Sequence, residues 1–235
     1  SLTKWPTQDK LPVSFNPVFL LEEGENPGLG IQFLHKQGID GRGIRIAIID
    51  QPLLKNHQEY VNQLIMYKEV GLIARMSQPK MHGSSVVSIA IGKTCGVAPQ
   101  ALLYYFALQS TSMPDNQTYC DIIDKIIQQN KNNCFSEQIR VVSISTGMFS
   151  QQLNFDKWQS ILSKAAQNGI FIATCDTTFL NYGTLTRILG KNCDVPENYR
   201  RGKFSSSNNL LLIPTGNRTT ASNLGPNEYI FWREG

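Results

Sequence analysis

Short, nearly continuous runs of apolar residues recur along the chain, and each has the length of one strand. These runs lie at 44–49, 102–106, 141–145, 170–173 and 210–213. They are rich in Ile, Val and Leu, and hydrophobic runs without polar alternation are typical of parallel strands covered on both faces. The pattern therefore predicts a central, mostly parallel sheet.

Helical periodicity appears between these runs. Apolar residues spaced three and four apart predict an amphipathic helix over 117–131 and a second one that starts near residue 155 and ends at Gly169. The alternation of strands and helices predicts an α/β fold, a three-layer αβα sandwich around a mostly parallel central sheet.

The first 28 residues follow a different pattern. They contain four prolines and a Glu-Glu-Gly-Glu-Asn run, so we expect an irregular arm packed over the domain, followed by a short helix over 29–37 that stops at Gly38. The sequence is thus divided into an N-terminal extension, 1–40, and one α/β domain, 41–235.

Composition excludes several function classes. A chain of 235 residues that is 41% hydrophobic can bury one full core, and its net charge of +4 is too mild to predict nucleic-acid binding. No apolar run of about 18 residues predicts a membrane span. Five cysteines without zinc-ligand spacing favour reduced thiols, so we expect no metal or cofactor. These thiols and the lack of a visible signal peptide favour the cytoplasm.

Two residues are candidates for chemistry. Asp50 directly follows the first apolar run, so it sits at a strand tip, where ligand sites of α/β sheets gather. Taken alone, Asp50 is also consistent with a turn-forming aspartate or with the ribose-binding carboxylate of a nucleotide-binding fold. His82 begins a segment of small and apolar residues that reads as a helix, and taken alone it also fits a packed or capping histidine. A helix N-terminus is expected to lower the pKa of His82 and favour its neutral form.

The two residues together carry a more specific signal. Gly-Arg-Gly-Ile-Arg-Ile-Ala-Ile-Ile-Asp50, His57, His82-Gly83 and Gly-Val-Ala-Pro99 follow one another in that order. This series resembles the subtilase family of serine peptidases (peptidase S8), and the likeness extends loosely over about 40–235. It implies a peptidase in which Asp50 orients His82 and His82 accepts the proton of a serine nucleophile. That role requires the two side chains to approach within about 4 Å.

The resemblance also assigns substrate-binding positions. Val141-Val-Ser-Ile-Ser-Thr-Gly-Met148 is similar to the family strand whose edge pairs with an extended peptide. Ser145, Thr146 and Gly147 inherit that role, and the implied partner is a peptide or protein substrate.

The chain departs from the family at several places. Asp176 stands at the oxyanion position, where the family has an Asn that donates a hydrogen bond. Cys175 replaces a Gly of the substrate pocket, and we expect it to be a buried structural thiol. The segment after His82 lacks the insertion that forms a calcium site in many subtilisins, so no calcium is expected there.

The nucleophile is the largest departure. Ser222 has a proline four residues later but lacks the preceding Gly-Thr, and the resemblance instead puts the serine beyond Gly235, in a C-terminally truncated chain. We therefore expect apolar surface around 82–92 and 210–213, covered by the missing segment or by another chain. The sequence leaves two readings open: a serine endopeptidase, or a catalytically inactive subtilase-like domain that binds peptides or regulates a partner. A nucleotide-binding domain would need a phosphate cradle, which the sequence does not contain.

Overall fold

A five-stranded parallel sheet forms the centre of the protein. The computed structural model describes residues 5–71, 78–108, 115–134, 137–175, 182–202 and 211–233. The strand order is β2-β3-β1-β4-β5, and every pair is parallel. The strands are β1 Arg45–Asp50, β2 Leu64–Val70, β3 Leu102–Leu108, β4 Ile139–Ile144 and β5 Phe171–Thr174. The predicted α/β class and parallel sheet are confirmed.

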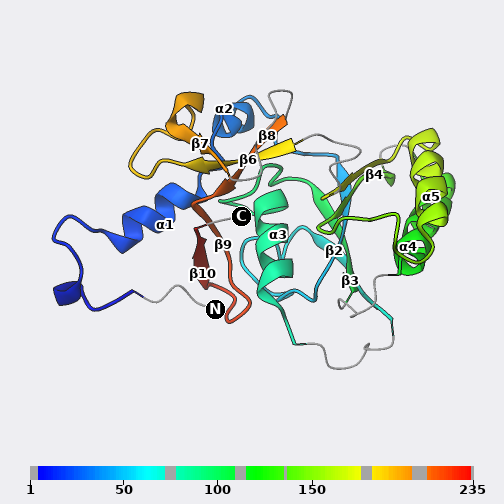
Figure 1. Cartoon of the computed structure of the whole chain (residues 1–235), viewed down its shortest axis with the longest axis horizontal. Helices are drawn as coiled ribbons and strands as arrows, with labels where there is room; N and C mark the ends of the chain where they lie inside the picture. Colours follow the sequence, from blue (N-terminus) through cyan, green and yellow to red (C-terminus); the bar gives the residue numbers. More distant parts are fainter. Residues whose placement is uncertain are drawn as a thin grey trace.

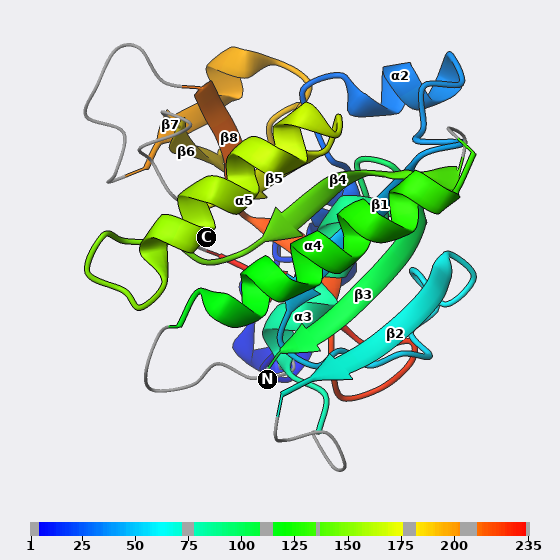
Figure 2. The same cartoon turned by 90° about the vertical axis from the view of Figure 1, so that its right-hand side faces the viewer.

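Helices cover both faces of this sheet (Figures 1 and 2). Helix α3, Met81–Ile91, lies on one face, and α4, Gln117–Asn132, and α5, Phe155–Gln167, lie on the other. Successive residues of β1 point into two separate cores, as the pleat of a strand requires. Ile49 packs with the side chains of α4 and α5, whereas Ile48 packs with those of α3. The predicted three-layer arrangement is confirmed.

The two predicted amphipathic helices are present. The apolar stripe of α4 is buried against the sheet, and α5 buries Trp158, Ile161 and Ala165 on the same side. Gly169 follows α5 with a positive φ of 68°, which glycine adopts without strain. None of the helices in the described ranges is long and apolar enough to cross a membrane.

Two strand predictions need correction. β2 was not predicted, because this edge strand is only partly buried and carries Lys68 and Glu69 within it. The run at 210–213 was expected in the central sheet, but β8, Leu211–Gly216, belongs to a separate three-stranded sheet. It pairs there with β6, Tyr182–Arg187, which in turn pairs with β7, Tyr199–Arg201. A 3₁₀ turn, η3 Pro196–Asn198, precedes β7. The apolar run identified a strand but not its neighbours.

The N-terminal arm is more regular than predicted. After a 3₁₀ turn, η1 Gln8–Lys10, it forms helix α1, Pro17–Glu25. Pro17 occupies the first turn, and the Asn16 side chain accepts a hydrogen bond from the N–H of Phe19, so both helix-start preferences are met. The predicted helix over 29–37 is present as α2, Ile31–Lys36.

Helix α1 packs against a hairpin from the other end of the chain. The hairpin consists of β9, Arg218–Ala221, and β10, Tyr229–Trp232. Thr219 Oγ1 donates to the carbonyl of Leu21 at 2.7 Å, and a Cβ added to Gly24 would lie 2.3 Å from the same hydroxyl. The arm is therefore tied closely to the domain.

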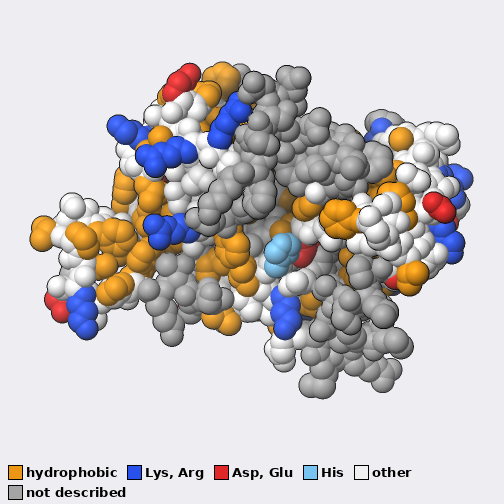
Figure 3. Space-filling model, in the orientation of Figure 1, with side chains coloured by type: hydrophobic (Ala, Val, Ile, Leu, Met, Phe, Trp, Pro, Cys, Tyr) orange, Lys and Arg blue, Asp and Glu red, His pale blue; other side chains and the backbone are white. Residues whose placement is uncertain are grey.

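The hairpin also covers α3. The N–H of Ala221 donates to Ser88 Oγ, and Thr220 Oγ1 donates to Ser85 Oγ, both at 2.9 Å. Val87 and Ile91 are fully buried, so the apolar surface expected around 82–92 is not found. Leu211 in β8 is 63% exposed, as expected for 210–213. Hydrophobic side chains, including Val18 and Phe19, also gather at the surface over α1 (Figure 3).

Candidate active site

Asp50 ends β1, at the carboxyl edge of the parallel sheet. Its side chain is only 3% exposed. Oδ1 accepts a hydrogen bond of 2.7 Å from the N–H of the next residue, Gln51. A buried carboxylate is stabilised by such donors and by a positively charged partner, since it has lost most of its hydration.

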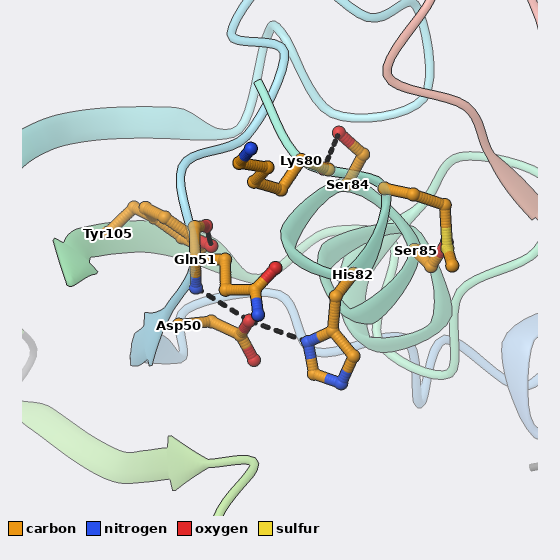
Figure 4. Close-up of polar contacts among 8 residues, drawn as sticks. Asp50, Gln51, Lys80, His82, Ser84, Ser85 and Tyr105 are labelled. Carbon is orange, nitrogen blue, oxygen red and sulfur yellow. Dashed lines mark hydrogen bonds and ion pairs between the residues drawn. The ribbon is translucent and has the colours of Figure 1, made fainter. Parts of the chain in front are cut away.

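His82 approaches this carboxylate from the first turn of α3. Its Nδ1 lies 2.7 Å from Asp50 Oδ1, and Figure 4 shows the imidazole directed at the carboxylate. The His82 side chain is 46% exposed, so one ring nitrogen faces a buried acceptor while the other side of the ring remains accessible. The structure thus brings together the two residues that the sequence singled out.

The bond to Asp50 sets the protonation chemistry of His82. In neutral imidazole one nitrogen donates and the other accepts, so a donating Nδ1–H leaves Nε2 as the base. The hydrogen bond and negative charge of Asp50 raise the pKa of His82 above its ordinary value, although burial acts in the opposite direction. The expected lowering by the helix N-terminus is therefore wrong, because a direct carboxylate contact outweighs it.

Close packing fixes the junction between β1 and α3. A Cβ at Gly83 would lie 2.2 Å from the carbonyl oxygen of Gln51 and 2.6 Å from the hydroxyl of Tyr105. The Tyr105 hydroxyl itself donates to that carbonyl. Ser84 Oγ accepts a hydrogen bond from the N–H of Leu54. Only glycine after His82 permits this close approach of helix and strand.

A pocket of about 150 Å³ opens beside the Asp50–His82 pair. Ser145 and Thr146, which the sequence suggested for substrate binding, line it directly after β4. Four further lining residues, Ile49, Gln51, Leu108 and Tyr119, were not predicted as site residues. Gln51 and Leu108 were detectable in principle, since each lies at or next to the carboxyl end of a sheet strand. Tyr119 had been assigned only to the apolar stripe of its helix.

The remaining predicted site residues lie along the same edge. Gly147 follows Thr146, and the carbonyl of Thr146 accepts a hydrogen bond of 3.2 Å from the N–H of Cys175. The Cys175 side chain is exposed, so the expectation of a buried thiol is wrong. Cys175 is the residue directly after β5, and it is accessible to solvent there. Asp176, the oxyanion position, lies outside the described residues.

Ser222 is placed in the hairpin rather than beside His82. It is fully buried, its N–H donates to the carbonyl of Glu228, and its Oγ accepts from the N–H of Leu224. It is not among the residues lining the pocket. Its hydrogen bonds give it a structural part in the β9–β10 turn.

His57 has a structural part as well. It is fully buried, its ring pairs with the carbonyl of Glu228 at 2.9 Å, and Nδ1 accepts from the N–H of Glu59. These contacts define a neutral ring with the proton on Nε2, and burial lowers the pKa of His57. Among the described residues, no group of three or more His, Cys, Asp or Glu is arranged to hold a metal ion.

Comparison with known proteins found similarity in sequence and in structure. No model of a known protein family matches the chain. It is 33% identical over 85 residues to the subtilisin-like protease PopC of Myxococcus xanthus (strain DK1622), a match that covers 32% of this chain and 18% of that protein. The chain therefore spans less than a fifth of the length of this curated relative.

Solved structures show the same fold over most of the chain. The prenylagaramide maturation protease PagA superposes with a TM-score of 0.60 at 14% identity, covering 87% of this chain and 74% of PagA. The patellamide maturation protease PatG superposes at 0.59 and 14% identity, with the same coverage. These superpositions show a subtilisin-like fold, and the sequence similarity to PopC covers 85 residues of this chain.

Proposed function

We propose that this chain carries the Asp–His part of a serine-type endopeptidase site. The observation that carries the proposal is the 2.7 Å contact between His82 Nδ1 and Asp50 Oδ1, with the imidazole half-exposed beside a pocket lined by Ser145 and Thr146. A buried carboxylate that holds an accessible imidazole by one nitrogen is the arrangement needed for general-base catalysis.

The proposed reaction is hydrolysis of a peptide bond in two steps. His82 Nε2 takes the proton from a serine hydroxyl as its oxygen bonds to the substrate carbonyl carbon, and Asp50 stabilises the imidazolium. The imidazolium then protonates the leaving amine as the C–N bond breaks, which leaves an acyl-enzyme. Water, deprotonated by the same imidazole, attacks the ester carbonyl carbon. The C–O bond to the serine then breaks, the imidazolium returns the proton to the serine oxygen, and the acid is released.

The substrate is proposed to bind as an extended strand along Ser145–Gly147. Ser145–Gly147 directly follow the end of β4, and main-chain groups at such a position can add a peptide strand by β-augmentation. A solved complex of the PatG macrocyclase with a peptide supports peptide recognition by this fold.

We propose that the nucleophile is a serine that follows residue 235, as the family resemblance implies. Serines close to His82 in sequence are engaged elsewhere: Ser84 with Leu54 and Lys80, and Ser85 with the Ala221 carbonyl. No serine hydroxyl in the described part of the chain is hydrogen-bonded to His82 Nε2.

A fluorophosphonate probe with mass-spectrometric mapping tests the proposal. A version of the protein that continues past residue 235 should be labelled on one serine beyond that position, and His82→Ala should abolish the labelling. Ser222→Ala, in the buried turn, is the matched control and should leave it intact. Absence of labelling in the longer protein would overturn the proposal in favour of an inactive peptide-binding domain. Labelling that His82→Ala leaves unchanged would contradict the role of the Asp–His pair.

A further inference from the structure

One oxygen of the Asp50 carboxylate has no donor. Oδ1 accepts from both Gln51 N–H and His82 Nδ1, whereas Oδ2 is buried and no described residue donates to it. A buried acceptor left without a partner costs about 1–3 kcal/mol, and more when it is charged. A hydrogen-bond donor to Asp50 Oδ2 would therefore stabilise the carboxylate.

Strand alternation indicates which residue supplies it. Ile49 of β1 and Ile144 of β4 are in register and both point into the core under α4 and α5. Ser145 is the first residue after β4, and continuing this register by one step places it beside Asp50 on the α3 face of the sheet. Both also line the same pocket of about 150 Å³.

We propose that Ser145 Oγ donates a hydrogen bond to Asp50 Oδ2 and thereby acts as a positioning residue for the Asp50–His82 pair. Ser145 Oγ has no other hydrogen-bond partner among the described residues, so its hydroxyl is available to the carboxylate. With donors on both oxygens, the carboxylate plane is fixed, and so is the direction in which it holds the imidazole.

Besides His82, three other side chains with donors line the pocket, those of Gln51, Tyr119 and Thr146, and Thr146 is one residue farther than Ser145 from the registered pair Ile49–Ile144. Figure 4 shows Asp50 Oδ2 turned away from the Gln51 side chain. Tyr119 comes from α4, on the opposite face of the sheet from α3, although the charge of Asp50 contributes to raising its pKa. The other titratable groups that interact with Asp50 are His82 and Tyr105, and the Tyr105 hydroxyl already donates to the Gln51 carbonyl.

Nuclear magnetic resonance titration of His82 in the 235-residue chain tests the proposal. Removing a donor from Asp50 leaves more negative charge facing the imidazole, so Ser145→Ala should raise the pKa of His82 by about 0.5 unit. Ser145→Thr, which keeps the hydroxyl, should retain the wild-type value. Ser143→Ala is the matched control, because Ser143 lies two residues earlier, in β4 and in register with Ile48. Backbone amide spectra establish that each variant is folded.

An unchanged pKa of His82 in Ser145→Ala would overturn the proposal. So would a shift caused by Tyr119→Phe and not by Ser145→Ala, which would identify Tyr119 as the donor. The catalytic meaning of the inference rests on the proposed function, but the titration needs no activity. A chain that fails to label with the probe can still show the Ser145 effect, so the two failures are distinguishable.

Discussion

His82 Nδ1 and Asp50 Oδ1 lie 2.7 Å apart although 32 positions separate the residues in the sequence. The contact joins the tip of a buried strand to the first turn of a helix on one face of the sheet. Its strength depends on Asp50 being ionised and buried, since a buried carboxylate interacts with a cation more strongly than one in water. The first prediction follows from removing that charge.

Asp50→Asn should lower the pKa of His82 by about one unit or more, because the negative charge that stabilises the imidazolium is lost. Imidazole resonances followed against pH measure this directly. An unchanged titration of His82 would show that the two side chains do not interact in solution.

The pH dependence of stability should reflect two histidines with opposite shifts. Burial lowers the pKa of His57 below 6.5, so protonation favours the unfolded chain and stability falls as pH drops below about 6.5. The pKa of His82 is raised, so its contribution is fully present below about 6.5 and is lost as pH rises through the higher, folded-state value.

Urea unfolding between about pH 5 and pH 8 separates the two effects. His57→Gln should flatten the loss of stability on the acid side, and His82→Gln should flatten the loss on the alkaline side. If both variants keep the wild-type pH profile, the assigned environments of these rings are wrong.

Gly83→Ala should disrupt the site and destabilise the fold. The new methyl group would overlap the Gln51 carbonyl, which is backbone and cannot move away without shifting the end of β1. Overpacking of this kind typically costs about 1–3 kcal/mol. We expect a lower thermal midpoint and a His82 pKa closer to its ordinary value. The double variant with Tyr105→Phe should recover little, because the backbone clash remains. Full stability with an unperturbed His82 would refute the assigned packing.

Tyr229→Phe should reduce the free energy of unfolding by about 1.5–3 kcal/mol, the usual range for a hydrogen bond to a charged group. The Tyr229 hydroxyl donates at 2.5 Å to Glu59, a buried carboxylate that also accepts from Thr94 and Cys95. Tyr119→Phe is the matched control, since no described residue is hydrogen-bonded to that hydroxyl. Denaturant unfolding above about pH 6 measures the difference, and equal losses in both variants would contradict the role of the bond.

The parts of the fold that sequence predicts well are those with a strong local signal. β1, β3, β4 and β5 are short, mostly apolar runs, and α4 and α5 carry clear helical periodicity. Asp50 and His82 were identifiable because each directly adjoins such an element. The pairing of the two followed from a family resemblance rather than from spacing.

The features that could not be predicted from the sequence depend on contacts between segments far apart in the chain. Helix α1 is held by the β9–β10 hairpin, through Thr219 and the close approach at Gly24, and the arm alone shows only prolines and acidic residues. The sheet to which β8 belongs is set by its pairing with β6. The place of Tyr119 in the pocket depends on how α4 crosses the end of the sheet.

The central claim is that His82, held by Asp50, is the base of a serine peptidase, and the pH dependence of probe labelling tests it most directly. In a version of the protein that continues past residue 235, the fluorophosphonate rate should rise with pH along a single titration. Its midpoint should match the pKa of His82 measured by magnetic resonance and should shift down in Asp50→Asn. A labelling rate whose midpoint is unrelated to His82, or that survives His82→Ala, would contradict the account.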